Sequence, residues 1–146
     1  MTIDNELRQL EGVLEGLNYT VFLNVYTVGI GIDAQPEAII QSCFPRAVIG
    51  SASASNLTSV VNKFDRDVQY RGDSSAGPEP GTFDSPEFKR LHKTIRMELQ
   101  TTGRSAVDIH EFYLREGHPA YPVFWDYAFL FRFGDHSRIW IGSSSD

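Results

Sequence analysis

The chain has 146 residues, of which 41% are hydrophobic and 12% aromatic, and its formal net charge is −6. This size and composition predict a single domain over residues 1–146 that buries a core of its own. The acidic balance and the lack of any Lys/Arg run argue against a nucleic-acid-binding protein.

The hydropathy pattern and the cysteine content indicate a compartment. No segment has the composition of a signal peptide or the length of a membrane span. Cys43 is the single cysteine, so an internal disulfide framework is excluded, and we expect this thiol to serve as a small buried hydrophobic group. We therefore predict a cytoplasmic protein with no membrane contact.

The N-terminal segment predicts a helix followed by a strand. Leucines spaced at i, i+3, i+7 and i+10 give the helix one apolar stripe between Asp4 and Leu17. The following run, Tyr19–Val28, is rich in β-branched and aromatic residues on both of its faces. We expect it to be an interior strand rather than an edge strand.

The next segment predicts two short helices around a strand. Pro36 begins the first helix, which ends before Pro45. Arg46–Gly50 is the expected strand. Ser55 or Asn56 then caps the second helix.

A loop and a long helix follow. Gly72–Pro86 contains three glycines, three prolines and three serines, which predicts an exposed, flexible loop at 72–86. The sequence Asp84-Ser85-Pro86-Glu87 combines a capping residue, a proline at the first helical position and an acid in the first turn. It predicts a helix that carries an apolar stripe from Phe88 to Leu99 and ends at Gly103.

The C-terminal third predicts a three-stranded antiparallel meander. A strand at Val107–Leu114 precedes a hairpin of Val123–Phe133 and Arg138–Gly142, whose turn contains Gly134-Asp135. Alternate residues of the hairpin form an aromatic face, which we expect to pack against the long helix. The predicted fold class is therefore α+β, with an antiparallel sheet packed against two or more helices.

Two patterns that suggest a cofactor or a metal have simpler explanations. Gly29-Ile30-Gly31-Ile32-Asp33-Ala34 matches a relaxed dinucleotide fingerprint, but no acid follows at the distance that would hold a ribose. Asp108 and His110 share one face of a predicted strand, and a third metal ligand would have to come from a distant histidine. We predict no cofactor and no metal.

The most unusual polar residue is Asp126, which interrupts an apolar strand. We expect it to face solvent or to pair with Arg132 or Arg138. In an alternative hypothesis, the protein is a small ligand-binding or hydrolytic domain with an aromatic cavity. Its catalytic residues would then be Asp126, His118, Asp108 and His110.

We favour a non-enzymatic protein-binding domain over an enzyme. Small size, acidity and an aromatic C-terminal hairpin resemble bacterial immunity proteins in general type, which implies an inhibitor of a toxin. An acidic protein suits a basic partner, and the expected contact residues are Asp73, Glu79 and Asp84. A homodimer formed through exposed aromatic residues is a third hypothesis.

Overall fold

The computed structural model describes residues 2–146. The α-helices are α1 (Asp4–Leu14), α2 (Pro36–Cys43), α3 (Leu57–Val68) and α4 (Pro86–Ser105), and a 3-10 turn η1 (Thr82–Asp84) precedes α4. The strands are β1 (Gly16–Leu17), β2 (Thr20–Val28), β3 (Val48–Ser55), β4 (Gly77–Pro78), β5 (Asp108–Glu116), β6 (Trp125–Arg132) and β7 (Ser137–Ser145).

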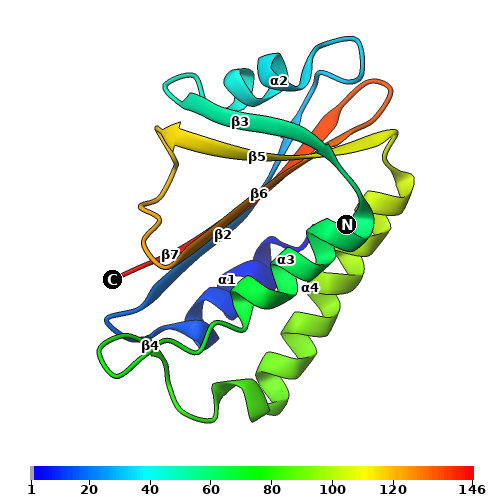
Figure 1. The fold of residues 1–146 in the computed structure, drawn as a ribbon. Coiled ribbons are helices and arrows are strands. Elements are labelled where there is room, and N and C mark those ends of the chain that lie inside the picture. The colour runs from blue at the N-terminus through cyan, green and yellow to red at the C-terminus, as the bar shows by residue number, and fades with distance from the viewer. Residues whose placement is uncertain (1) are drawn as a thin grey trace.

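A five-stranded antiparallel sheet in the order β2-β7-β6-β5-β3 forms the middle layer. Figure 1 looks along this sheet from the β3 edge, with α2 on one face and α1, α3 and α4 on the other. Strands β5, β6 and β7 are consecutive neighbours, so the predicted meander and the α+β fold class are confirmed. A separate two-stranded sheet, β1-β4, fastens the segment before α4 to the end of α1.

Side-chain alternation along β6 divides the core into two clusters. Trp125, Tyr127, Phe129 and Phe131 face α1, α3 and α4 and are buried among the apolar residues of α4. The aromatic face is therefore core, as predicted. The alternate residues Ala128 and Leu130 face α2 and pack in the second cluster. Burial of each large apolar side chain contributes roughly 1.5–3 kcal/mol to folding.

The long helix begins where the sequence predicts and ends two residues later. The Ser85 hydroxyl accepts a hydrogen bond from the Phe88 backbone N–H at 3.2 Å, and Pro86 occupies the first turn. Gly103 does not end the helix. A Cβ atom there would lie 2.5 Å from the end of the Leu57 side chain, so a larger residue would force this leucine of α3 to shift.

The two N-terminal elements differ from the prediction. Helix α1 ends at Leu14 rather than Leu17, because Gly16–Leu17 pairs with β4 instead of continuing the helix. The expected interior position of β2 is wrong, since β2 is an edge strand. Its two apolar faces are explained by helices on both sides of the sheet: Leu23 belongs to the cluster under α1 and Phe22 to the cluster under α2.

Strand β3 begins at Val48 rather than at the predicted Arg46 and is longer than predicted. It continues from Gly50 to Ser55, where small side chains gave no strong strand signal in the sequence. The capping residue of α3 is Asn56, whose Oδ1 accepts a hydrogen bond from the Ser59 backbone N–H at 2.9 Å. The expected helix after this cap is confirmed.

Candidate functional site

The most open feature of the sheet is a split between β5 and β6. The two strands pair from Asp108↔Arg132 to Glu111↔Phe129, and no further. Beyond that point β5 remains paired with β3, and β6 remains paired with β7. The two strands therefore diverge towards the connection that joins them, residues 117–124.

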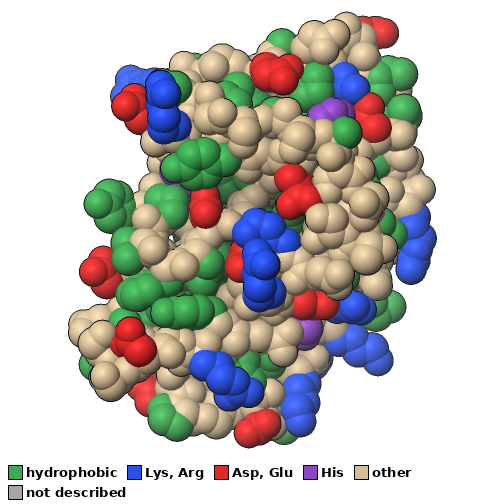
Figure 2. All heavy atoms as spheres, viewed as in Figure 1, with side chains coloured by type: hydrophobic (Ala, Val, Ile, Leu, Met, Phe, Trp, Pro, Cys, Tyr) green, Lys and Arg blue, Asp and Glu red, His purple; other side chains and the backbone are tan. Residues whose placement is uncertain are grey.

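The split encloses a half-open cavity of about 510 Å³, which we call the β5–β6 cleft. Tyr113, Tyr121 and Val123 line it and are 49%, 76% and 43% exposed. The strand ends supply the charged lining residues Arg115, Glu116 and Asp126. In the space-filling view of Figure 2, apolar side chains gather around a hollow on the left of the molecule, where Figure 1 shows the β5–β6 connection.

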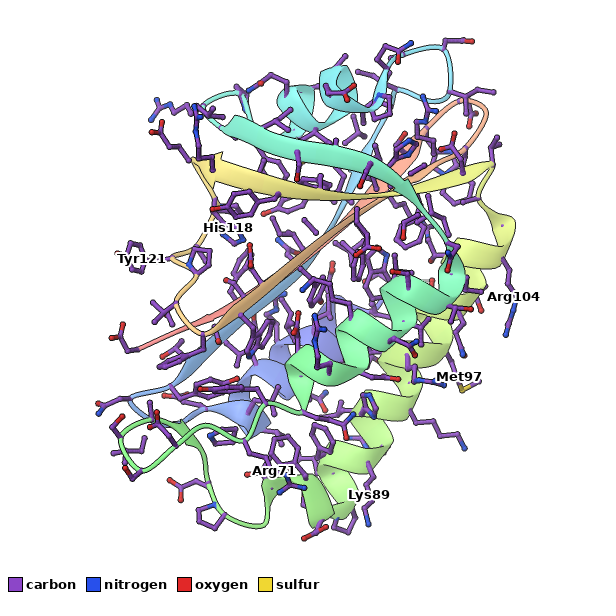
Figure 3. All side chains as sticks on the ribbon, in the orientation of Figure 1. Arg71, Lys89, Met97, Arg104, His118 and Tyr121 are labelled. Carbon is purple, nitrogen blue, oxygen red and sulfur yellow. The ribbon has the colours of Figure 1, made fainter. Side chains whose placement is uncertain are left out.

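His118 lies at the wall of the β5–β6 cleft. Its Nδ1 accepts a hydrogen bond from the Ala120 backbone N–H at 2.9 Å, so a neutral ring carries its proton on Nε2. That Nε2 is buried and has no partner within residues 2–146. Figure 3 shows His118 close to the sheet and Tyr121 projecting away from it.

Burial lowers the pKa of His118 below its ordinary value, and the charge of Asp126 opposes that shift in pKa. The imidazole is therefore neutral at pH 7. Asp126 is half-buried on the same cavity wall, but no hydrogen bond or ion pair between the two residues occurs in the described part of the chain. The arrangement places a carboxylate and a neutral imidazole beside aromatic rings without joining them into a catalytic dyad.

The opposite end of the β5–β6 pair is closed by an ion pair. Arg132 donates from Nε and Nη2 to the two carboxylate oxygens of Asp108, at 2.9 and 2.6 Å, and from Nη1 to the Ala34 carbonyl at 2.7 Å. These hydrogen bonds hold the pKa of Asp108 below its usual range. His110 lies beside this pair, with Nδ1 3.6 Å from Asp108.

The four residues of the alternative catalytic hypothesis therefore occupy two places. Asp126 and His118 share the β5–β6 cleft, whereas Asp108 and His110 lie at the closed end of the strand pair. The expected ion pair of Asp126 with Arg132 or Arg138 is wrong. Arg132 binds Asp108, and Arg138 lies 3.6 Å from Glu98 on α4.

The expected protein-contact residues lie in the segment before α4. Asp73, Glu79 and Asp84 are all exposed, which keeps them available to a partner. The Asp73 carboxylate also accepts hydrogen bonds from the Ser75 and Ala76 backbone N–H groups, at 2.8 and 3.1 Å. The segment is thus partly held by local hydrogen bonds and by the β1-β4 pair, and its flexibility remains a prediction.

The remaining sequence candidates have structural roles. Cys43 is half-buried beside the α2 cluster, and burial raises the pKa of its thiol to about 11, which makes a reactive thiolate unfavourable. A Cβ atom at Gly31 would lie 2.3 Å from the Gly134 carbonyl, so this glycine permits two loops to touch. Residues 2–146 contain no cluster of three or more His, Cys, Asp or Glu side chains suited to a metal.

Two features were missed at the level of sequence. One is the β5–β6 cleft itself, whose local signal is the proline-bracketed connection between Pro119 and Pro122. The other is a set of polar groups inside the main core. There the Trp125 indole N–H donates to the Tyr19 hydroxyl at 2.7 Å, and burial raises the pKa of Asp67. Tyrosines in apolar runs are compatible with either surface or core, so the pattern alone could not find this set.

Comparison with protein-family models, with curated proteins and with solved structures finds no match for this chain. The described residues include no helix with the length and apolarity needed to cross a membrane.

Proposed function

We propose that this protein is a non-enzymatic protein-binding domain and that the β5–β6 cleft is the centre of its contact surface. The observation that carries the proposal is the gathering of exposed Tyr113, Tyr121 and Val123 at one cavity. The other large exposed apolar side chains in residues 2–146 lie outside its lining: Leu17, Ile32, Met97 and Val107.

The composition of the cleft suits a protein partner. Tyrosine and arginine are enriched among the residues that dominate binding energy, and Tyr113, Tyr121 and Arg115 supply both types at one place. The cavity is half-open, so a protruding side chain of a partner can enter it. Polar groups around an apolar centre are the usual arrangement of a protein interface.

Charge favours a basic partner. The chain carries a net charge of −6, and Glu116 and Asp126 contribute carboxylates to the cleft lining. The exposed acids Asp73, Glu79 and Asp84 add to the same field. An attraction of this kind speeds association and weakens as salt is added. A toxin inhibitor is the narrower form of the proposal, and it rests on this charge balance.

The test is affinity capture from the native host at low salt, with a cleft variant and a matched control. The expected result is one stoichiometric partner that is bound by the wild type and by Met97→Ala, but is lost with Tyr121→Ala and at high salt. Both substitutions truncate an exposed side chain, so neither should impair folding. A partner retained equally by both variants would remove the cleft from the interface, and capture of none would contradict the proposal.

A charge-reversal variant tests the acidic segment separately. Asp73→Lys, Glu79→Lys and Asp84→Lys together should slow association and reduce its salt dependence if these side chains face the partner. Surface plasmon resonance with the captured partner measures both quantities. An unchanged association rate would confine the contact surface to the β5–β6 cleft.

A small-ligand or hydrolytic domain is the second candidate, favoured by the shared cavity wall of Asp126 and His118. The missing hydrogen bond between them and the buried Nε2 of His118 argue against proton transfer within this pair. A thermal-shift screen of small molecules against the wild type and Asp126→Asn tests this candidate. A ligand that stabilises the wild type alone would support it.

A further inference from the structure

The two edges of the sheet are protected to different extents. On the β2 edge, side chains of α1 occupy the backbone groups of Leu23: the Glu11 carboxylate accepts from its N–H at 2.7 Å, and the Arg8 guanidinium donates to its carbonyl. The Asn24 side chain accepts from the next outward N–H, that of Val25, at 2.9 Å. Another strand would have to displace these side chains before it could pair with β2.

The β3 edge has no such protection. Strand β3 pairs with β5 on one side, and within residues 2–146 no hydrogen bond reaches its other side. Its sequence, Val48–Ser55, contains no charged residue and no proline, which are the usual means of discouraging edge pairing. In Figure 1 this edge faces the viewer.

The straight part of the edge is Ser51–Ser55. The register against β5 shifts between Val48 and Ser51, and a bulge of this kind turns the first residues of the edge away from a partner. From Ser51↔Tyr113 to Ser55↔Ile109 the pairing is regular. The side chains here are serine and alanine, so a neighbouring backbone can approach them without steric conflict.

We propose that β3 pairs antiparallel with β3 of a second copy of this chain, about a two-fold axis at Ser53. Two five-stranded sheets would thereby join into one continuous sheet. In this arrangement Ser51 lies opposite Ser55, and Ala52 lies opposite Ala54. Small uncharged side chains then face one another, and no like charges meet across the axis.

This pairing uses the β3 edge, which contributes no residue to the lining of the β5–β6 cleft, and the response to salt distinguishes the two proposals. Each copy carries a net charge of −6, so added salt screens the repulsion between copies and strengthens the dimer. Binding of a basic partner should respond in the opposite direction. The two proposals can therefore fail separately.

The test is sedimentation velocity over a concentration series at two salt concentrations. The wild type should shift with concentration towards twice the chain mass of 16.4 kDa, and the shift should occur at lower concentration in high salt. Ser53→Lys should remain monomeric, because two ammonium groups would meet at the axis. Thr27→Lys, which changes an exposed position on the β2 edge, should dimerise like the wild type.

Two variants of opposite charge at Ser53 distinguish a loss of dimerisation from a loss of folding. Ser53→Glu should also be monomeric alone, and an equimolar mixture with Ser53→Lys should restore the dimer through opposite charges at the axis. A wild type that is monomeric at every concentration would overturn the proposal. So would equal effects of Ser53→Lys and Thr27→Lys, or a mixture that stays monomeric.

Discussion

The two ends of the β5–β6 pair hold similar chemical groups in different states. At the closed end, Asp108 and Arg132 form a bidentate ion pair, and the arginine also binds the Ala34 carbonyl. At the open end, Asp126 has no such partner in the described residues, and Arg115 is exposed. The polar side chains of the closed end are therefore taken up by contacts within the protein, whereas Asp126 and Arg115 at the open end remain available to another molecule.

The largest expected difference between the two ends concerns their aromatic residues. Phe131 pairs with Ile109 next to the closed end and is fully buried, so Phe131→Ala should lower the free energy of unfolding by about 3–5 kcal/mol. Phe124 is half-buried beside the cleft, so Phe124→Ala should lower the free energy of unfolding by a smaller amount. Urea unfolding followed by circular dichroism measures both values. Equal losses would mean that the open end is packed as tightly as the closed one.

The arginines at the two ends should also differ in their contribution to stability. Arg132→Met leaves Asp108 and the Ala34 carbonyl without their donor, and we expect a loss of about 1–3 kcal/mol. Arg115→Met, at the open end, should change stability by less than about 0.5 kcal/mol. Urea unfolding followed by circular dichroism measures the change in stability of both variants. The reverse order would contradict the assignment of Arg132 as the clamp of this strand pair.

The pH dependence of the free energy of unfolding tests whether His118, at the open end, is buried. Because the folded state lowers the pKa of His118, the unfolded chain binds this proton more readily. The stability associated with His118 is therefore complete above its ordinary pKa of about 6.5 and decreases as the pH falls below that value. Unfolding at pH 7.5 and pH 5.5 should show a larger decrease for the wild type than for His118→Gln. Identical decreases would place His118 in a solvated environment.

The smallest expected effect on stability is that of Asp126→Asn. A half-buried carboxylate with no ion-pair partner should change the free energy of unfolding by less than about 0.5 kcal/mol when it is neutralised. Asp108→Asn should cost more, because it removes the charge that Arg132 binds. Under the proposed function the order is reversed for partner binding, and calorimetry with the captured partner would show it.

Elements determined by nearby residues were predictable from the sequence. Ser85-Pro86-Glu87 begins a helix by capping and backbone geometry alone, and Gly134-Asp135 turns the hairpin within a few residues. The edge position of β2 was not predictable in this way. The hydrophobic pattern of β2 predicts that both of its faces are buried, but it does not predict which strands lie beside β2 in the sheet.

Only the polar residues of the candidate site were predictable from the sequence, whereas its exposed Tyr113, Tyr121 and Val123 and its arrangement were not. The sequence singles out Asp126 because a carboxylate interrupts an apolar strand, and it includes His118 among the candidate catalytic residues of the alternative hypothesis. Their separation from Asp108 and His110 depends on where β5 leaves β6. That point is set by packing between distant segments, and single-sequence patterns do not record it.

The place of β7 in the sheet has a consequence for biosynthesis. Strand β7 lies between β2 and β6, and its pairing with β2 joins Thr20 to Ser145. The early strand therefore cannot begin to pair in this sheet until the ribosome has added residue 137, and it cannot finish pairing until residue 145 is present. Contacts so distant in sequence form slowly, and the nascent chain must keep the apolar faces of β2 from aggregating in the meantime.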